Sequence, residues 1–128
     1  MTQALNTLTG EKYINVETFK RDGSGVKTPV WFAIDGETLV FLTNRNSWKV
    51  KRLRRNPAVR FAVCDVRGKV RGEWFDGECS LLVERSEEKR AEARLKSHYR
   101  VAWPLFKLGA WVGRRIKDHV YYRITPTQ

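Results

Sequence analysis

A short polar stretch between an apolar run and a basic run has residue types that can bind a phosphate. Two hydroxyl residues, Thr43 and Ser47, lie close to Lys49 in the sequence. Ser47 is a favourable helix N-cap, and Val50 and Leu53 follow three positions apart, as on one helix face. A helix that begins here would present free backbone N–H groups and the positive end of its dipole to an anion. The stretch therefore predicts a phosphate site at the start of a short helix.

Strands on both sides must hold this helix in place. Alternating or apolar runs predict strands at residues 12–19, 27–34 and 38–43 before the helix, and at 58–64, 70–83 and 120–124 after it. Asp22–Gly25 and Asp35-Gly36 predict turns between the first three strands. The helix ends before Pro57, because proline disfavours the helical conformation in the residue that precedes it. We expect bulges at Gly72 and Gly77 within the fifth strand.

The order of these elements predicts a small barrel. A helix from Ser86 carries an apolar stripe at four-residue spacing, formed by Ala91, Leu95 and Tyr99, and a second helical piece begins at Pro104. Six short strands, with one helix after the third and helices before the last, indicate a mainly β fold with minor α content. A sheet of this size closes its edges by curling on itself or by pairing with a second copy. We expect residues 1–128 to form one domain.

Pro29 lies inside the second predicted strand. Proline cannot donate to a ladder of hydrogen bonds, so it belongs at a sheet edge or a bulge, where neighbouring backbone groups can be open to a ligand. Taken by itself, Pro29 is more typical of an ordinary strand start after the turn. Its proximity in sequence to the predicted phosphate site favours the first interpretation.

Composition favours an anionic partner. The chain has 25 Lys and Arg against 14 Asp and Glu, a formal net charge of +11. Nucleic acid, an anionic membrane surface and a small polyanionic ligand all fit, as does a basic surface without a specific partner. No apolar run reaches membrane-spanning length, and the first residues lack a signal-peptide layout. Cys64 and Cys79 have no metal spacing, so we expect buried thiols and a cytoplasmic protein.

The side chains alone offer little catalytic chemistry. His98 and His119 have no companions at metal-ligand spacing, and no Ser or Cys lies in a nucleophile signature. We therefore expect no metal site and can name no catalytic residue. The reactive atoms of an enzyme with this sequence would come from a cofactor. The five tryptophans either fill the core or mark an interface: Trp31, Trp48, Trp74, Trp103 and Trp111.

Several motifs, in the same order, resemble the pyridoxamine 5'-phosphate oxidase-like proteins. Residues 41–49, Phe-Leu-Thr-Asn-Arg-Asn-Ser-Trp-Lys, with Asn-Pro-Ala-Val at 56–59, are similar to the flavin-phosphate motif of that family. In the oxidase itself the pattern is Phe-Tyr-Thr-Asn, then Ser-Arg-Lys, then Asn-Pro-x-Val. Four further segments resemble the branch that uses the deazaflavin coenzyme F420: residues 19–23, 28–32, 49–57 and 65–68. The likeness is best over residues 10–83.

The resemblance implies a split β-barrel homodimer with the cofactor at the subunit interface. Thr43, Ser47 and Lys49 match positions that hold the cofactor phosphate. Residues 29–31 match the strand whose backbone lies against the tricyclic ring. The cofactor-binding residues expected from this match are Pro29, Val30, Trp31, Thr43, Asn44, Ser47, Trp48, Lys49 and Val50.

Departures from the oxidase pattern argue against a vitamin B6 oxidase. Trp48 replaces the arginine of Ser-Arg-Lys, which removes one phosphate ligand, and Gly72 stands where the oxidase has a ring-contacting glutamine from its partner subunit. The substrate-binding signature near the oxidase C-terminus is also missing. On the last strand, Tyr121, Tyr122 and Arg123 are weaker candidates for contacts with substrate or with a partner subunit.

The charge beside the predicted phosphate site favours F420 over flavin mononucleotide, because F420 carries a phosphodiester and an oligoglutamate tail. Residues 45–55 contain six cations and no acid: Arg45, Lys49, Lys51, Arg52, Arg54 and Arg55. We expect an F420-dependent reductase that transfers hydride between the reduced deazaflavin and an electron-poor double bond of a small organic substrate. We expect no nucleic-acid partner and no membrane insertion. Two alternatives stay open: a flavin reductase or electron carrier that binds flavin mononucleotide, and a nucleic-acid-binding module.

Overall fold

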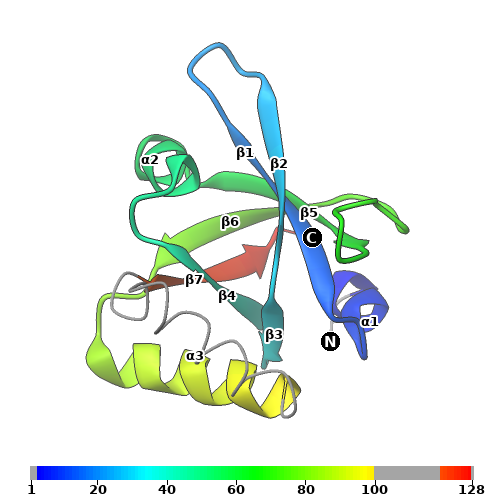
Figure 1. The fold of residues 1–128 in the computed structure, drawn as a ribbon, viewed down its shortest axis with the longest axis vertical. Helices are drawn as coiled ribbons and strands as arrows, with labels where there is room; N and C mark the ends of the chain where they lie inside the picture. Colours follow the sequence, from blue (N-terminus) through cyan, green and yellow to red (C-terminus); the bar gives the residue numbers. More distant parts are fainter. Residues whose placement is uncertain (1–2, 100–118, 128) are drawn as a thin grey trace.

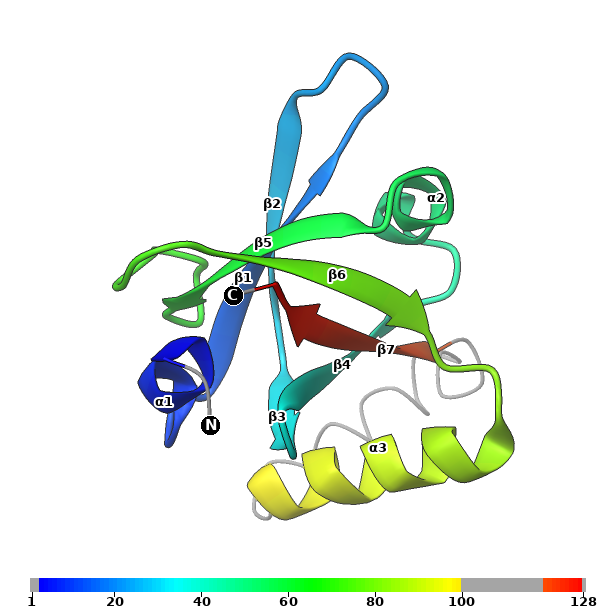
Figure 2. The same ribbon diagram turned by 180° about the vertical axis from the view of Figure 1, so that it is seen from behind.

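The computed structural model describes residues 3–99 and 119–127. In these residues the chain forms one curled antiparallel sheet of seven strands, together with three helices (Figures 1 and 2). The elements in chain order are α1 (Gln3–Leu8), β1 (Tyr13–Phe19), β2 (Gly25–Val30), β3 (Phe32–Asp35), β4 (Thr38–Asn44), α2 (Trp48–Arg55), β5 (Ala58–Cys64), β6 (Phe75–Leu81), α3 (Arg85–His98) and β7 (His119–Pro126). This mainly β half-barrel confirms the fold class predicted from the sequence.

The two edge strands of the sheet follow one another almost directly in the sequence. The order is β2-β1-β5-β6-β7-β4-β3, with every neighbouring pair antiparallel. β2 and β3 are therefore the two edges, yet only Trp31 separates them in sequence. Figure 1 shows β2 running directly into β3, and Figure 2 shows β5, β6 and β7 crossing on the opposite side. The sheet has to curl for this connection to exist.

The break at Trp31 corrects the predicted second strand, which ran from 27 to 34 without interruption. Val30 pairs with Ile14 of β1, whereas Phe32 pairs with Phe41 of β4. The chain therefore changes partner strand between these two residues, and the sheet has seven strands instead of six. A run of alternating residues does not reveal a change of partner. Pro29 does lie in an edge strand, as predicted, because β2 ends the sheet.

Two other expectations about the sheet are wrong. β6 begins at Phe75, and the earlier part of the predicted strand contributes one isolated bridge, between Val70 and Cys64. Gly72 lies outside β6, and Gly77 pairs regularly with β5 and β7 instead of forming a bulge. A Cβ at Gly77 would lie 2.7 Å from Ile124 Cγ2, so glycine is needed there for close packing between strands.

The helices agree with the sequence in part. α2 and α3 are present, with Ser47 at the N-cap position of α2. α1 was not predicted, because its six residues are too short to show a helical period; it nevertheless buries Leu5 and Leu8. The predicted helical piece that begins at Pro104, with Trp103 and Trp111, lies outside the described residues.

The core fills the concave side of the sheet and the space beneath α3. Its largest buried side chains include three phenylalanines, Phe32, Phe41 and Phe61. The stripe of Ala91, Leu95 and Tyr99 packs against β3 and β4, as its spacing predicts. Cys64 and Cys79 are free buried thiols, as predicted. Burial raises the pKa of both, that of Cys64 to about 11, and neither is therefore a thiolate near neutral pH.

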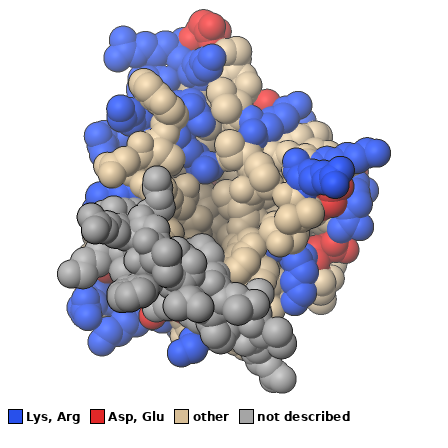
Figure 3. Space-filling model, in the orientation of Figure 1, with Lys and Arg blue, Asp and Glu red and all other residues tan. Residues whose placement is uncertain are grey.

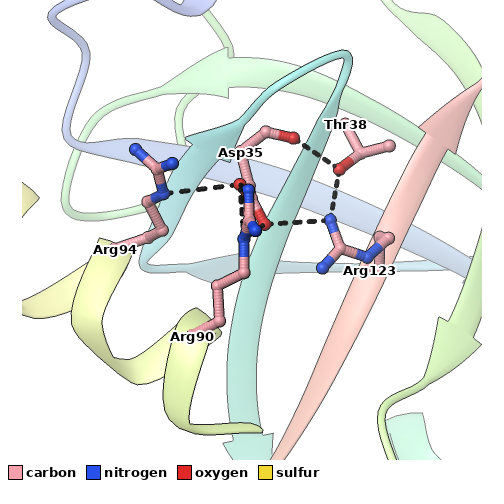
Figure 4. Close-up of polar contacts among 5 residues, drawn as sticks. All are labelled: Asp35, Thr38, Arg90, Arg94 and Arg123. Carbon is pink, nitrogen blue, oxygen red and sulfur yellow. Dashed lines mark hydrogen bonds and ion pairs between the residues drawn. The ribbon is translucent and has the colours of Figure 1, made fainter. Parts of the chain in front are cut away.

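A buried carboxylate also attaches α3 to the sheet (Figure 4). Asp35 ends β3 with its side chain only 2% exposed. Arg90 of α3 donates to both of its oxygens, the shortest contact being 2.9 Å, and Arg94 lies 3.4 Å away. Arg123 of β7 donates to Asp35 Oδ2 at 3.2 Å and to Thr38 Oγ1 at 2.5 Å. Burial alone would raise the pKa of Asp35, but the hydrogen bonds and charges of Arg90 and Arg123 hold it below its usual value.

Replacing this carboxylate is expected to destabilise the protein. Asp35→Asn should lower the free energy of unfolding at pH 7 by about 2–3 kcal/mol, because three arginines lose their shared anion. Because the pKa of Asp35 is lower in the folded state, its contribution is present above the ordinary carboxyl pKa and is lost as pH falls through the folded-state value. The difference from wild type, measured by urea unfolding, should therefore shrink at acidic pH.

Asp76→Asn is the control for this prediction. The Asp76 carboxylate is 71% exposed and lies 3.9 Å from Arg60, so its loss should change the unfolding free energy by less than about 0.5 kcal/mol. Equal effects of the two substitutions would show that the Asp35 cluster does not stabilise α3 against the sheet.

Candidate functional site

A cavity of about 360 Å³ lies where the end of β2 passes the end of β4. In the space-filling view of Figure 3 the molecule is hollowed near its centre, where the surface is uncharged, and lysine and arginine side chains lie above and to the right of the hollow. The lining of the cavity comes from β1, β2, β4, α2, β7, the Trp31 junction and the loop after β5. Elements far apart in sequence thus meet at one place.

The cavity brings together six of the nine residues expected to bind a cofactor: Pro29, Val30, Trp31, Thr43, Asn44 and Lys49. The other three lie close by in the chain but do not line it. Ser47 is at the start of α2, and Val50 is buried in the core. Trp48 is 70% exposed and lines a separate groove. The two predicted segments, the one around Pro29 and the one around Lys49, therefore converge on the same cavity.

Lys49 supplies a buried cation to this cavity. The residue is only 7% exposed, and its Nζ donates to Thr43 Oγ1 at 3.1 Å. Among residues 3–99 and 119–127, no carboxylate forms an ion pair with it. Burial, with a smaller contribution from the charge of Arg52, lowers the pKa of Lys49 to about 8. A buried ammonium without a counter-ion is costly, so the site is electrostatically suited to an anion.

Ser47 adds an unpartnered hydroxyl beside this lysine. It occupies the predicted N-cap position, with φ −73° and ψ 155°, but its side chain makes no capping hydrogen bond. The Val50 N–H instead donates to the Ser47 carbonyl at 3.2 Å. In the described part of the chain, Ser47 Oγ is buried without a hydrogen-bond partner. Buried polar atoms are nearly always satisfied, so a ligand oxygen or a water fits here.

Tyr99, at the end of α3, packs against Trp31, which lines the cavity. Its ring stacks on Trp31 with centroids 4.4 Å apart. Its hydroxyl accepts the Phe32 N–H at 2.9 Å and donates to the carbonyl of Lys12. Burial raises the pKa of Tyr99, so the hydroxyl stays protonated. The sequence predicted Tyr99 only as part of an apolar stripe. Because the hydroxyl of a buried tyrosine needs a hydrogen-bond partner, the residue type could also have predicted a polar contact at this position.

The loop after β5 forms part of the rim. Asn15 of β1 donates to the carbonyl of Gly68 at 2.7 Å, which holds the loop beside Pro29. Gly68 has φ +90°, so glycine suits this turn; a Cβ there would lie 3.5 Å from Pro29, which is an ordinary contact distance. Four further lining residues were not among the predicted site residues: Tyr13, Leu42, Val66 and His119. Leu42 and Val66 lie in segments that resemble family motifs, but no role was assigned to them, and Tyr13 and His119 lie outside those segments.

The weaker candidates on β7 make contacts within the chain. Tyr122 is buried and stacks on Phe41 at 5.4 Å, and the Tyr121 hydroxyl donates to Glu92 at 3.3 Å. Arg123 is bonded to Asp35. The described residues contain no group of three His, Cys, Asp or Glu side chains that could hold a metal ion. They also contain no helix with the length and apolarity needed to cross a membrane.

A match over the whole sequence identifies the family of the chain. The sequence model for the family described as pyridoxamine 5'-phosphate oxidase matches residues 1–128. The chain therefore belongs to the pyridoxamine 5'-phosphate oxidase-like family, as the motifs around Thr43 and Pro29 indicate. A search of curated proteins found no match to this sequence.

Solved structures share the fold at low sequence identity. A FAD-binding protein from Mesorhizobium loti has a TM-score of 0.70 and 20% identity, covering 100% of this chain and 91% of that one. An F420 reductase has a TM-score of 0.64 and 20% identity, with 100% and 97% covered. A candidate pyridoxamine 5'-phosphate oxidase from Listeria innocua has a TM-score of 0.67 and 20% identity, with 97% and 90% covered. At these identities the likeness shows the fold alone.

The buried charge of Lys49 should be costly in the ligand-free protein. Lys49→Met is expected to raise the free energy of unfolding at pH 7 by about 1–3 kcal/mol. Because the folded-state pKa lies below the unfolded value, the unfolded chain binds more protons between about pH 8 and pH 10.5, and wild-type stability should rise with pH in that window. Lys49→Met should lack this rise.

Chemical unfolding at pH 7 and pH 10 measures both effects, and Lys51→Met, at an exposed position, is the control. A destabilised Lys49→Met protein at both pH values would contradict the expectation.

Proposed function

We propose that this protein is an oxidoreductase that binds coenzyme F420 in the cavity and transfers hydride between the reduced coenzyme and an unsaturated organic substrate. The observation that carries the proposal is the buried Lys49, which has no acidic partner among the described residues and lies beside Thr43. An enclosed cation of this kind suits a bound phosphate group. Membership of the family supports a flavin-type cofactor in general.

The residues present fit a phosphorylated cofactor. Lys49, Thr43 and Asn44 line the cavity and would hold the phosphate. The unpartnered hydroxyl of Ser47 lies at the start of α2, outside the cavity lining, and would have to turn toward the phosphate to join them. Pro29, Val30 and Trp31 line the same cavity and would lie along the ring system. No acidic residue of the described chain lines the cavity, so an anionic cofactor would meet no carboxylate there.

The chain's own part in the reaction would be to bind and orient the reactants and to exclude water. When bound, the deazaflavin supplies the hydride. The apolar side chains of Val30, Trp31 and Leu42 provide a wall of low polarity, and stacking on Tyr99 fixes Trp31. Lys49 would hold the cofactor by its charge, because Thr43 fixes the position of its ammonium group.

Two features support F420 over flavin mononucleotide. Trp48, which replaces an arginine of the oxidase motif, is 70% exposed and does not line the cavity, so a flavin phosphate would have one ligand fewer. Basic side chains continue along α2 beyond the cavity, and the positive potential that they add near it favours the more anionic cofactor without direct contact. Flavin mononucleotide remains the second candidate, because the Thr43 to Lys49 site itself would accept either phosphate.

Titration of the purified protein with each cofactor tests the proposal. We expect F420 to bind at least tenfold more tightly than flavin mononucleotide, measured by cofactor fluorescence at fixed ionic strength. Lys49→Ala should weaken F420 binding by about 10- to 100-fold, since a charge-assisted hydrogen bond is lost. Wild-type affinity should also fall as pH rises above about 8, because the free protein then loses the Lys49 charge.

Arg54→Ala and Lys49→Arg are the matched controls. Arg54 lies on the same helix and is exposed, so its removal should change affinity by less than about threefold. Lys49→Arg keeps the charge and should remove the fall in affinity above pH 8. Equal small effects of Lys49→Ala and Arg54→Ala would place the phosphate elsewhere, whereas tighter binding of flavin mononucleotide would select the second candidate.

We further propose that the active form is a homodimer with the cofactor at its interface. The cavity lies beside an open sheet edge, β2, and its rim includes the exposed apolar side chain of Val66. An edge strand and an exposed apolar residue next to a site are features that a second copy would cover. Light scattering of the cofactor-bound protein should give twice the 15.0 kDa chain mass. A stable cofactor-binding monomer would disprove the shared site.

A further inference from the structure

A second concave surface lies between the β1–β2 hairpin and α2. We call it the basic groove; its volume is about 550 Å³. Its charged lining comes from both sides, with Lys20 and Arg21 on the hairpin and Lys51, Arg52 and Arg55 on α2. Figure 1 shows the hairpin rising beside α2, and Figure 3 shows lysine and arginine side chains gathered over the same region. Among the described residues, none lines both the groove and the cavity that contains Lys49.

Acidic residues of the described ranges do not neutralise the five cations of the basic groove. None of them forms an ion pair with an acidic residue of the described ranges, in contrast to Arg60, Arg71 and Arg90. The one acid in the hairpin turn, Asp22, is hydrogen-bonded to Ser24. Like charges that face one another in a concave surface repel, so the groove favours a bound polyanion.

Two of these cations are held in place by β1. Arg52 Nε donates to Thr18 Oγ1 at 2.6 Å, and Arg55 Nη2 donates to the Phe19 carbonyl at 3.3 Å. Burial and the charge of Arg55 together lower the pKa of Arg52, in keeping with a cation that lacks an anionic neighbour. A fixed guanidinium loses less conformational entropy on binding than a mobile side chain does. The groove is therefore partly preorganised for anionic groups.

The position of Trp48 suggests that a ligand of the basic groove carries a planar group as well as anionic groups. It lines the same groove with 70% of its surface exposed, and Lys51 Nζ lies 4.3 Å from its ring centroid. A chain of carboxylates or phosphates alone would use the cations and leave the indole in water. A planar base would cover it, and stacking on an aromatic side chain beside basic residues is how single strands of nucleic acid are bound.

We propose that the basic groove binds a nucleotide phosphate, with the base stacked on Trp48 and the phosphate groups at Lys51, Arg52 and the hairpin cations. The volume is within the range of sites for small ligands. The same chemistry belongs to a free nucleotide and to a segment of single-stranded nucleic acid. The second source corresponds to the nucleic-acid alternative that the sequence left open.

The test uses the full chain, both free and saturated with F420, and two probes: ADP and a fluorescent eight-nucleotide oligo(dA). We expect both probes to bind at low salt. Trp48→Leu should weaken binding by about tenfold, the effect of losing one stacked base, and Lys51→Gln should also weaken it. Arg54→Gln removes the same charge from α2 outside the groove and should change affinity by less than about threefold. Unfolding midpoints confirm that each variant is folded.

The two probes also distinguish the source of the nucleotide. Tighter binding of the oligonucleotide, with a steep salt dependence, identifies a single strand, whereas equal affinities identify a free nucleotide. Both results support nucleotide binding in the basic groove.

Failure of both probes to bind would overturn the proposal. So would equal effects of Trp48→Leu and Arg54→Gln, or loss of probe binding on saturation with F420, which would assign the groove to the cofactor. The free protein is measured in parallel, so the result does not depend on the proposed function.

Discussion

The curl of the sheet depends on one covalent constraint, the single residue that joins its two edges. β2 and β3 are at opposite ends of the strand order, yet Val30 and Phe32 are separated only by Trp31. Two consecutive peptide links span no more than about 7 Å, so the edges must approach each other there. Because the partner strand changes at this point, the local hydrogen bonding is completed from outside the sheet, with Tyr99 accepting the Phe32 N–H. An open, flat sheet is incompatible with this connection.

The same constraint creates the cavity. Bringing the end of β2 onto the end of β4 places Pro29 to Trp31 opposite Thr43 and Lys49. The burial of Lys49 follows from this geometry, and so does its lowered pKa. A lysine at the same position in an isolated helix would be fully hydrated and would have no special affinity for an anion. The curl of the sheet thus buries an otherwise ordinary basic residue and lowers its pKa.

Charge is arranged in two opposite ways in this molecule. Around Asp35, three arginines share one buried carboxylate and fix α3 to the sheet. Around α2, basic residues have no acidic ion-pair partner among the described residues, and they divide between two surfaces. Lys49 faces the cavity, whereas Lys51, Arg52 and Arg55 face the basic groove. Six of the 25 basic residues, and no acid, therefore lie within residues 45–55, in and beside one short helix that separates two concave surfaces. Positive charge gathered in this way attracts anionic ligands more strongly than the same charge spread evenly over the surface would.

Local patterns in the sequence determined most of the elements and the residue types of the site. Alternating or apolar runs predicted β1, β4, β5 and β7, and Ser47 with the apolar spacing predicted the start of α2, because these are properties of residues close together in the chain. The motifs also selected six residues that line one cavity. Only the tertiary structure decided the break at Trp31, the role of Tyr99 and the burial of Lys49. Each depends on contacts between distant segments, and the same residues would behave differently if the sheet did not bring β2, β4 and α3 together.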